Sequence, residues 1–411
     1  MKFYLVGGAV RDDLLGLPVK ERDYVVVQAN PDDMIQQGFV GVGKSFPVFL
    51  HPDTKEEYAL ARTERKTAGG YHGFEFNTAT DVTLEEDLAR RDLTINAMAQ
   101  DETGNIIDPY GGQHDLKLKL LRHVSPAFIE DPVRVLRVAR FAARFLPLGF
   151  AVAEETLALM QKMVKEGEID YLVKERVWKE MQRALEEPAP QEFIRVLRKC
   201  GALKVVLSEI DALYGVPQSK TSHPEVDTGI HIELVLTQAA KLSTDPEVRF
   251  AALVHDVGKA LTPKELLPKH PHHEQKGALL VKAMCERLNV PKDYQALAIL
   301  VAKYHGDCYH AQQKTATELL ALFNHCDFFR RPERFEKMLL ACKADFQGRP
   351  GFEDAEYPPE ETLRTAFRVA KTLDFSAAIA QLSDKAGPVI ADKISELRIA
   401  AIANALKIPT V

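Results

Sequence analysis

The hydrophobic pattern of this chain changes near residue 130, and that change limits the folds the chain can adopt. Before it, short apolar runs at 3–6, 23–28, 47–50 and 58–61 are separated by Gly, Pro and Asn, which is typical of strands and turns. Beyond it, long amphipathic stretches with short Pro or Gly breaks predict helices almost throughout. We therefore expect an α+β protein in which a small mixed α/β head is followed by a helical body.

Composition excludes several classes of protein. The 411 residues suffice for about three domains, and a content of 46% hydrophobic and 27% charged residues excludes a disordered or fibrous chain. No apolar run reaches the roughly 18 residues of a membrane span. Five cysteines without a CxxC pair argue against a disulfide framework or a cysteine zinc site and favour a reducing cytoplasm. The net charge of −6 leaves RNA binding to a local basic strip.

The first apolar run leads into a glycine turn, GGAVRD at 7–12, and then into a helical pattern. Glycines such as Gly8 let the backbone approach a phosphate closely, and a helix N-terminus offers free N–H groups. Arg11 adds a cation at the same place. This segment predicts a phosphate-binding turn, with a purely structural turn as the alternative.

Two carboxylates precede the second apolar run. Glu21 and Asp23 are two residues apart, so on a strand they would share one face while Arg22 points away. Paired carboxylates repel one another unless a cation lies between them, and hard oxygen ligands suit Mg²⁺ carrying a nucleoside triphosphate. The alternative is a solvated strand edge with ordinary surface charges.

Two further segments of the head are polar. The stretch 66–73 (KTAGGYHG) is predicted to be a mobile loop, with disorder of no functional meaning as the alternative. The stretch 86–97 combines acids, two adjacent arginines and a helical apolar pattern. Arg91 could neutralise phosphate charge near a metal–triphosphate site, or belong to ordinary ion pairs on a helix surface.

The strongest single pattern is an arginine-bearing helix that begins at Asp131-Pro132. Arg134, Arg137, Arg140 and Arg144 fall within an arc of about 120° at 100° per residue, and apolar residues fill the rest. A solvated basic face would carry acids among its arginines, and none occurs here. The pattern therefore favours a buried helix that presents its guanidinium groups to an anionic ligand.

A second group of chemically active residues lies in the helical body. His255-Asp256 ends an apolar helical stretch, with His231 upstream and His273 and His305 downstream. Imidazole and carboxylate ligands suit Ni, Mn, Fe, Co or Zn better than Mg, and water on such an ion becomes a nucleophile for phosphate esters. The alternative is a set of ordinary core or surface histidines. Residues that we expect to lie outside this site, or to contribute weakly, are His270, His272 and Asp307.

The head motifs, in this order and at these spacings, resemble those of the class II tRNA nucleotidyltransferases. They are GGxVRD at 7–12, the carboxylates at 21 and 23, RRDLTINA at 90–97 and EDPxRxLRxARF at 130–141. These bacterial CCA-adding enzymes of the polymerase-β superfamily share their head with bacterial poly(A) polymerases. One departure is Glu21, where the family usually has Asp; glutamate is one methylene longer and could still bind Mg²⁺. The histidine order resembles the HD metal-dependent phosphohydrolase superfamily, whose domain some CCA-adding enzymes append.

The resemblance implies template-independent addition and repair of the 3′-terminal CCA of tRNA from CTP and ATP. It places Mg²⁺ on Glu21 and Asp23, both expected to be catalytic, and base reading on Asp131 and Arg134. One acceptor beside one donor selects C and A together, because both bases present an amino donor beside a ring-nitrogen acceptor. The residues expected to hold the triphosphate are Gly8, Arg11, Arg91, Arg137 and Arg140.

For the helical body, the resemblance implies a phosphohydrolase (phosphatase, 2′,3′-cyclic phosphodiesterase or 2′-nucleotidase) that uses a transition metal such as Ni²⁺ or Mn²⁺. His255 and Asp256 are expected to be catalytic. The same two residues, with His231, His273 and His305, are expected to hold the ion.

These inferences divide the chain into four parts. We expect a nucleotidyltransferase head at 1–139, a helical neck that binds nucleotide and RNA at 140–220, a helical HD domain at 221–330 and a helical tail at 331–411. The expected partners are tRNA, CTP and ATP, without DNA or a membrane, and the expected state is a cytoplasmic monomer, with a dimer as the alternative.

Other functions remain open at this stage. They are a poly(A) polymerase, an enzyme adding only CC or only A, and an HD phosphohydrolase whose head only binds RNA. The last 60 residues carry 7 basic and 9 acidic side chains. Because related poly(A) polymerases usually carry a basic extension, this balance disfavours poly(A) synthesis.

Overall fold

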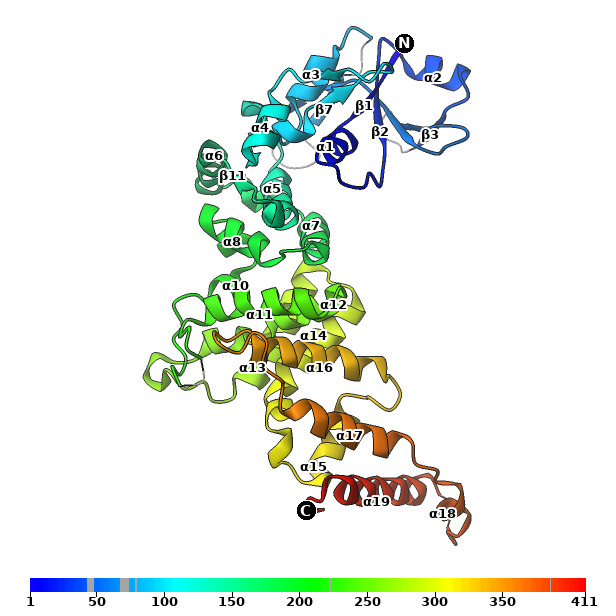
Figure 1. Cartoon of the computed structure of the whole chain (residues 1–411), viewed down its shortest axis with the longest axis vertical. Helices are drawn as coiled ribbons and strands as arrows, with labels where there is room; N and C mark the ends of the chain where they lie inside the picture. The colour runs from blue at the N-terminus through cyan, green and yellow to red at the C-terminus, as the bar shows by residue number, and fades with distance from the viewer. Residues whose placement is uncertain (43–47, 67–73, 78–79, 222, 385) are drawn as a thin grey trace. The chain divides into compact units, whose positions relative to one another are not determined.

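The computed structural model describes residues 1–411 apart from 43–47, 67–73, 78–79, 222 and 385 (Figure 1). The chain divides into two compact units, Met1–Val206 and Leu207–Val411. The first combines a sheet with helices, and the described part of the second consists of helices joined by turns. The predicted α+β class with a helical body is therefore confirmed. The stretch 67–73, most of the predicted mobile loop, lies outside the described residues.

A sheet with seven described strands forms the centre of the first unit, in the order β3-β4-β5-β2-β1-β8-β9. β1 (Lys2–Val6) pairs antiparallel with β2 (Asp23–Val27), and β2 pairs parallel with β5 (Glu57–Leu60). These strands match three of the predicted apolar runs to within one residue; of the run 47–50, residue 47 is outside the described residues. The other strands are β3 (Val40–Val42), β4 (Val48–Leu50), β8 (Ala99–Gln100) and β9 (Ile106–Ile107).

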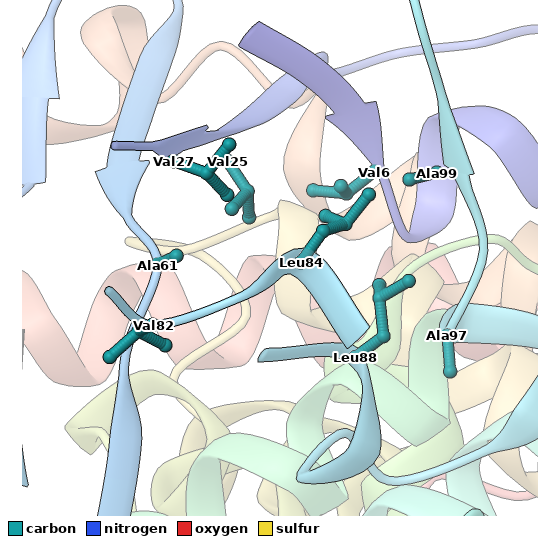
Figure 2. Close-up of a cluster of buried hydrophobic side chains, with 9 residues drawn as sticks. All are labelled: Val6, Val25, Val27, Ala61, Val82, Leu84, Leu88, Ala97 and Ala99. Atoms are coloured by element: carbon teal, nitrogen blue, oxygen red, sulfur yellow. The ribbon is translucent and has the colours of Figure 1, made fainter. Parts of the chain in front are cut away.

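β2 is buried on both faces because its side chains alternate. Val25 and Val27 belong to one apolar cluster and Val26 to another. Figure 2 shows the first cluster, where α3 (Leu84–Ala89) packs Leu84 and Leu88 against the strands. The register places the last residue of β1 opposite the first residue of β2, at Asp23. The core therefore holds the turn after β1 beside the acidic start of β2.

Helices form the rest of the first unit. α5 (Val133–Phe145) is buried along most of its length and contacts α7 (Lys174–Glu186) and α8 (Gln191–Cys200). It begins one residue later than the sequence predicts, at Val133 with Pro132 in the N-cap position, and Asp131 Oδ1 accepts the backbone N–H of Val133 at 3.0 Å. The other helices are α1 (Gly8–Leu14), α2 (Pro31–Gln36), α4 (Gly112–Leu118), α6 (Glu154–Lys165) and α9 (Leu203–Val206). Two small sheets pair β6 (Thr63–Lys66) with β7 (Phe74–Asn77), and β10 (Leu120–Leu121) with β11 (Ala151–Val152).

The second unit is built around a group of four packed helices. They are α11 (Thr228–Leu242), α12 (Pro246–Val254), α14 (Lys292–Tyr309) and α16 (Glu333–Gln347). The remaining helices are α10 (Ser208–Asp211), α13 (His273–Leu288), α15 (Ala316–His325), α17 (Pro359–Lys371), α18 (Ser376–Ala380) and α19 (Gly387–Leu406). Among the described helices, none combines the length and apolar character needed to cross a membrane.

Candidate functional site

One cavity in the first unit, of about 700 Å³, brings together residues from five separate parts of the sequence. It is bounded by the turn after β1, the start of β2, the segment after α3, and helices α5 and α7. All nine residues that the sequence singled out in this unit line it: Gly8, Arg11, Glu21, Asp23, Arg91, Asp131, Arg134, Arg137 and Arg140.

The turn between β1 and α1 positions two arginines of the cavity. Gly7 has φ of 68°, and a Cβ there would lie 2.8 Å from Nη1 of Arg91, so a larger residue would displace that guanidinium. Arg11 is buried; its Nε donates to Asp12 Oδ1 at 2.8 Å and its Nη1 donates to Asn96 Oδ1 at 2.5 Å. The cation at Arg11 is thus fixed by two side chains, as a phosphate-binding role requires.

The carboxylates at 21 and 23 line the same cavity, but only Asp23 lies on a strand, unlike the prediction. β2 starts at Asp23, so Glu21 precedes the strand, and the argument that both share one strand face is wrong. Burial raises the pKa of Asp23, and the negative charges of Glu57 and Glu21 raise it further, while Arg91 opposes them. The oxygen donors and their mutual repulsion fit a hard divalent cation at this place.

Glu57 was missed by the sequence analysis. It lies opposite Asp23 in the parallel pairing of β2 with β5, and its charge acts on Asp23 more strongly than that of Glu21 does. No motif surrounds it; only the alignment of the two strands brings the two carboxylates together.

The arginines of α5 are paired with acids from other segments. The absence of acids within the helix predicts an anionic ligand, but in the structure acids from other segments pair with the arginines. The pairs are Arg137 Nε to Asp92 Oδ2 at 2.7 Å, Arg140 Nε to Glu180 Oε2 at 2.7 Å, and Arg144 Nη2 to Asp12 Oδ2 at 2.8 Å. These arginines still line the cavity, and their partners fix the directions in which they point.

Asp131 and Arg134, predicted as a base-reading pair, both line the cavity but are held by different partners. Arg176 of α7 donates to both oxygens of Asp131, at 3.1 and 2.9 Å. Arg134 donates to the backbone oxygens of Ala127 at 2.6 Å and Arg90 at 2.5 Å. No local motif marks Arg176, because its contact with Asp131 joins residues 45 positions apart.

We expect Asp92→Asn to lower the stability of the first unit. Burial alone would raise the pKa of Asp92, but Arg137, Asn96 and the N–H of Leu93 hold that pKa well below its ordinary value. Breaking the pair leaves Arg137 uncompensated. Because a third of the Arg137 side chain is exposed, we expect the free energy of unfolding to fall by about 3 kcal/mol, the lower end of the range for breaking a buried ion pair.

The pH dependence of this effect follows from the depressed pKa. The contribution of Asp92 is present above the unfolded pKa, about 4, and is lost as the pH falls toward the folded pKa. Urea unfolding at pH 7 and at pH 3 measures it. If the difference in unfolding free energy between Asp92→Asn and the unchanged protein is the same at pH 7 and at pH 3, the stabilising role of ionised Asp92 is contradicted.

The second unit gathers six metal-type side chains from five helical elements, and His223, in the segment before α11, lies with His231 and Asp345 as a seventh. His231 comes from α11, His273 begins α13, and His305 lies on α14. His255 and Asp256 occupy the junction between α12 and a 3₁₀ turn at Val257–Leu261. The sixth, Asp345, lies on α16 within the segment predicted as a tail, and its Oδ1 is 3.0 Å from Nε2 of His231. The only hint in the sequence was a lone acid within an apolar helical pattern.

Backbone contacts orient the imidazoles of this cluster. Nδ1 of His255 lies 2.8 Å from Ala252 O, and Nδ1 of His305 lies 3.0 Å from Val301 O. His273 makes the same kind of contact, at 2.8 Å from the backbone oxygen of His270. A carbonyl oxygen can only accept, so each Nδ1 carries the hydrogen and each Nε2 is left for another partner.

The carboxylates give the cluster a strong preference for positive charge. Burial would lower the pKa of His255, but Asp256 and Asp345 raise it to about 10. Despite burial, their surroundings hold the pKa of both carboxyls well below the ordinary value. Buried imidazole nitrogens facing ionised carboxylates are the donor set of a transition-metal site.

The weaker candidates lie outside this cluster. His270 Nε2 is 3.0 Å from Pro217 O and its Nδ1 is 2.8 Å from Thr262 Oγ1. His272 is exposed, and Asp307 accepts from Lys314 Nζ at 2.6 Å.

Comparisons with known proteins agree with this arrangement. Residues 3–122 match the poly(A) polymerase head domain family, residues 149–214 match the family described as the probable RNA and SrmB-binding site of polymerase A, and residues 228–334 match the HD domain family. The fold, the cavity of the first unit and the histidine cluster of the second unit thus define a poly(A) polymerase-type head joined to an HD domain. Domains of both kinds generally use divalent metals.

Relatives of high identity extend over nearly the whole chain. The multifunctional CCA protein of Thioalkalivibrio sulfidiphilus is 57% identical over 402 residues (98% of each chain), and that of Burkholderia multivorans is 54% identical over 414 residues (99% of this chain, 100% of the other). The chain belongs to the multifunctional CCA protein family. The sequence-based resemblance to CCA-adding enzymes with an HD domain is confirmed.

Solved structures share the fold at lower identity. The Bacillus stearothermophilus CCA-adding enzyme in complex with CTP has a TM-score of 0.64 at 22% identity, covering 98% of this chain and 89% of that one. The Thermotoga maritima CCA-adding enzyme complexed with tRNA has a TM-score of 0.65 at 20% identity, covering 99% and 90%.

Proposed function

We propose that this protein adds and repairs the 3′-terminal CCA of tRNA from CTP and ATP without a template. The observation that carries the proposal is one cavity in which the carboxylates of Glu21 and Asp23 meet the glycine turn and the α5 arginines. Relatives more than half identical over nearly the full chain are named for CCA, which supports the same conclusion.

The chemistry follows from the residues of the cavity. Glu21 and Asp23 would hold Mg²⁺, which when bound lowers the pKa of the tRNA 3′-hydroxyl and neutralises charge on the phosphates. Gly8, through its backbone, and the arginines hold the triphosphate so that the 3′-hydroxyl meets the α-phosphorus. The arginines assigned to this role are Arg11, Arg91, Arg137 and Arg140.

Base choice is assigned to Asp131 and Arg134. Cytosine and adenine each offer an amino donor and a ring-nitrogen acceptor, which match the carboxylate and the guanidinium. Uracil and guanine would leave buried donors and acceptors unpaired, at about 1–3 kcal/mol each. Since Arg176 already occupies both oxygens of Asp131, an incoming base has to share that carboxylate with Arg176.

We expect Arg134→Ala to loosen base choice. Loss of one reading donor should lower the preference for CTP over UTP by about 5- to 150-fold, as expected for about 1–3 kcal/mol. Steady-state incorporation of each nucleotide into tRNA ending before its CCA measures the ratio. Arg198→Ala, an exposed arginine on α8 outside the cavity, is the matched control. An unchanged ratio in Arg134→Ala would remove this residue from the reading role.

The second unit is assigned a metal-dependent phosphohydrolase activity on phosphomonoesters and 2′,3′-cyclic phosphates. His255 and Asp256, with His231, His273 and His305, would hold an ion such as Ni²⁺ or Mn²⁺; when bound, it supplies an activated water. The support is the buried cluster of imidazole and carboxylate groups in an HD-type domain. The same donor set suits Mg²⁺ poorly, so the two units should differ in their metals.

We also assign the domain boundaries, the cellular location and the oligomeric state. We assign the head to 1–139, the neck to 140–220, the HD domain to 221–330 and the tail to 331–411, with Asp345 of the tail completing the cluster. The protein is expected to act in the cytoplasm on RNA rather than DNA, as a monomer, with a dimer as the alternative.

One experiment separates the candidate functions. The protein is incubated with tRNA lacking its 3′ end, CTP, ATP and Mg²⁺, and the product is sequenced. Addition of CCA is expected. A product extended by a run of A residues would indicate a poly(A) polymerase. Extension by CC only, or by a single A, would indicate a partial enzyme, and an unextended tRNA would indicate a head that only binds RNA.

A further inference from the structure

The turn after α16 holds a buried arginine, Arg349, in a fixed place. Gly348 follows the last residue of α16, and a Cβ there would lie 2.8 Å from the backbone of Val235 on α11, so a side chain would push the turn away from α11. Gln347, which ends the helix, donates to the backbone oxygen of Ala355 at 2.8 Å and ties the following segment to α16. Arg349 is thereby enclosed and is only 7% exposed.

Arg349 differs in its partners from other arginines that are equally buried. Each of those donates to carboxylate or carbonyl oxygens at 2.5–3.1 Å, and they are Arg11, Arg134, Arg140 and Arg249. Nε of Arg349 has no hydrogen-bond partner among the described residues, and the ion pair of its Nη2 with Oδ1 of Asp345 spans 3.9 Å. A buried cation without a close acid is costly unless it meets an anion.

The guanidinium group of Arg349 lies beside the histidine cluster. Oδ1 of Asp345, which is 3.9 Å from Nη2 of Arg349, also lies 3.0 Å from Nε2 of His231 and 3.6 Å from Nε2 of His255. One carboxylate oxygen therefore separates this cation from the ring nitrogens assigned to the ion. A phosphate group that reacts at the cluster comes within reach of Arg349.

Aromatic rings hold the guanidinium and leave it accessible. Cζ of Arg349 lies 5.1 Å from the ring centroid of Tyr309 and 5.6 Å from that of Phe346. Phe346 is buried, whereas Tyr309 is exposed, and so is Phe352, whose ring lies 5.4 Å from that of Phe346. The rings limit the movement of the arginine, and the two exposed ones bring solvent next to this buried cation.

A second buried cation at the cluster, Lys259, is already satisfied. Its Nζ lies 2.6 Å from Asp256 Oδ2 and donates to Gln218 Oε1 at 2.8 Å. This ammonium group stabilises the carboxylate of Asp256, so it has little need of an added anion. Of the two cations, Arg349 is the one whose surroundings call for an anionic ligand.

We propose that Arg349 binds the phosphate group of the substrate in the second unit. The proposal rests on the phosphohydrolase activity assigned above and adds a residue that no sequence motif marks. A guanidinium suits this role, because its planar fork of donors matches two phosphate oxygens and keeps its charge when buried. Charge that develops on these oxygens during attack on the phosphorus is stabilised by the same group.

Binding of inorganic phosphate tests the assignment without relying on turnover. The full-length protein is saturated with Co²⁺, and phosphate is titrated while the visible absorption of the imidazole-bound Co²⁺ is followed. Arg349→Gln should raise the Kd for phosphate by about 10- to 150-fold, as expected for the loss of hydrogen bonds from a charged donor. Arg349→Lys keeps the charge but not the fork, so its Kd should lie between the two. Any ion held by the first unit contributes equally to all variants.

Controls separate phosphate binding from a general disturbance of the unit. Arg368→Gln removes an exposed arginine from the last turn of α17, and His310→Ala removes an exposed histidine at the end of α14, next to Tyr309. Both should bind phosphate as the unchanged protein does. Bound Co²⁺, measured by mass spectrometry at graded metal concentrations, should be the same in Arg349→Gln. Arg349→Lys serves in its place if circular dichroism shows that Arg349→Gln is unfolded.

The outcomes distinguish this proposal from the activity on which it rests. A Kd for phosphate that is unchanged in Arg349→Gln at saturating Co²⁺ would overturn the proposal, and weaker metal binding in that variant would then assign Arg349 to orienting Asp345. A Co²⁺ spectrum that phosphate does not alter in the unchanged protein would overturn it as well. Phosphate binding that depends on Arg349, without hydrolysis of phosphate esters, would support the phosphate site and contradict the activity.

Discussion

Asp23→Asn is expected to abolish CCA addition while phosphohydrolysis in the second unit continues. Asp23 is the only residue of the acidic pair that lies on the sheet, at the start of β2, and it faces the cavity with Glu21. Removal of a metal ligand should cost several kcal/mol of transition-state stabilisation, which is a fall in rate of at least about 10³-fold. Extension of tRNA lacking its 3′ end measures this loss.

The stability of the variant separates a lost ligand from a lost fold. Because burial and two neighbouring carboxylates raise the pKa of Asp23, its ionised form is unfavourable in the folded protein. The contribution of Asp23 to stability is therefore greatest below its unfolded pKa of about 4 and is lost as the pH rises through the folded value. At pH 7, Asp23→Asn should be at least as stable as the unchanged protein.

Asp13→Asn is a suitable control, because Asp13 is an exposed acid of α1 outside the cavity. It should leave addition unchanged. Residual addition by Asp23→Asn within tenfold of the unchanged protein, or loss of both activities together, would contradict the two-site arrangement.

The second large effect is expected for the HD cluster. Asp256→Asn should reduce phosphate ester hydrolysis by at least about 10³-fold and leave CCA addition intact. Asp256 lies within 3.9 Å of imidazole nitrogens of four histidines, which are His231, His255, His273 and His305. Each unit has its own core, so damage to this cluster should not reach the cavity of the first unit.

Hydrolysis of a chromogenic phosphate ester in the presence of Ni²⁺, measured beside tRNA extension in Mg²⁺, tests this separation. His255→Gln should behave like Asp256→Asn, and His310→Ala should behave like the unchanged protein. Hydrolysis that persists in both cluster variants would assign that activity to other residues.

Local sequence signals predicted the elements that carry the first site. Apolar runs ended by glycine or acidic residues fix β1 and β2, and Asp131-Pro132 marks the start of α5, because such signals act within a few residues. The nine cavity residues were found in the same way, from short motifs and from the family that these motifs resemble.

Residues that act through distant pairing could not be found in this way. Glu57 meets Asp23 only through the register of β5 against β2, and Arg176 reaches Asp131 from the neighbouring helix α7. Asp345 joins the histidines from a segment more than 100 residues after His231. In each case, the contact depends on how helices or strands pack, which a pattern along one segment does not contain.

Two predictions were wrong for the same reason, because each used only residues that are close together in the sequence. Strand periodicity was applied to Glu21, but the strand begins at Asp23, since only from that residue does β2 pair with β1 and β5. The absence of acids within α5 predicted an anionic ligand as the partner of its arginines, whereas Asp92, Glu180 and Asp12 reach them from other segments.

The acid partners of the α5 arginines also bear on repeated turnover. An enzyme that adds three nucleotides has to let pyrophosphate leave after each addition, and bare guanidinium groups would retain so highly charged a product. Arginines that already share a carboxylate can return to it when the phosphates depart, so each release restores a neutral pair instead of exposing an unpaired cation.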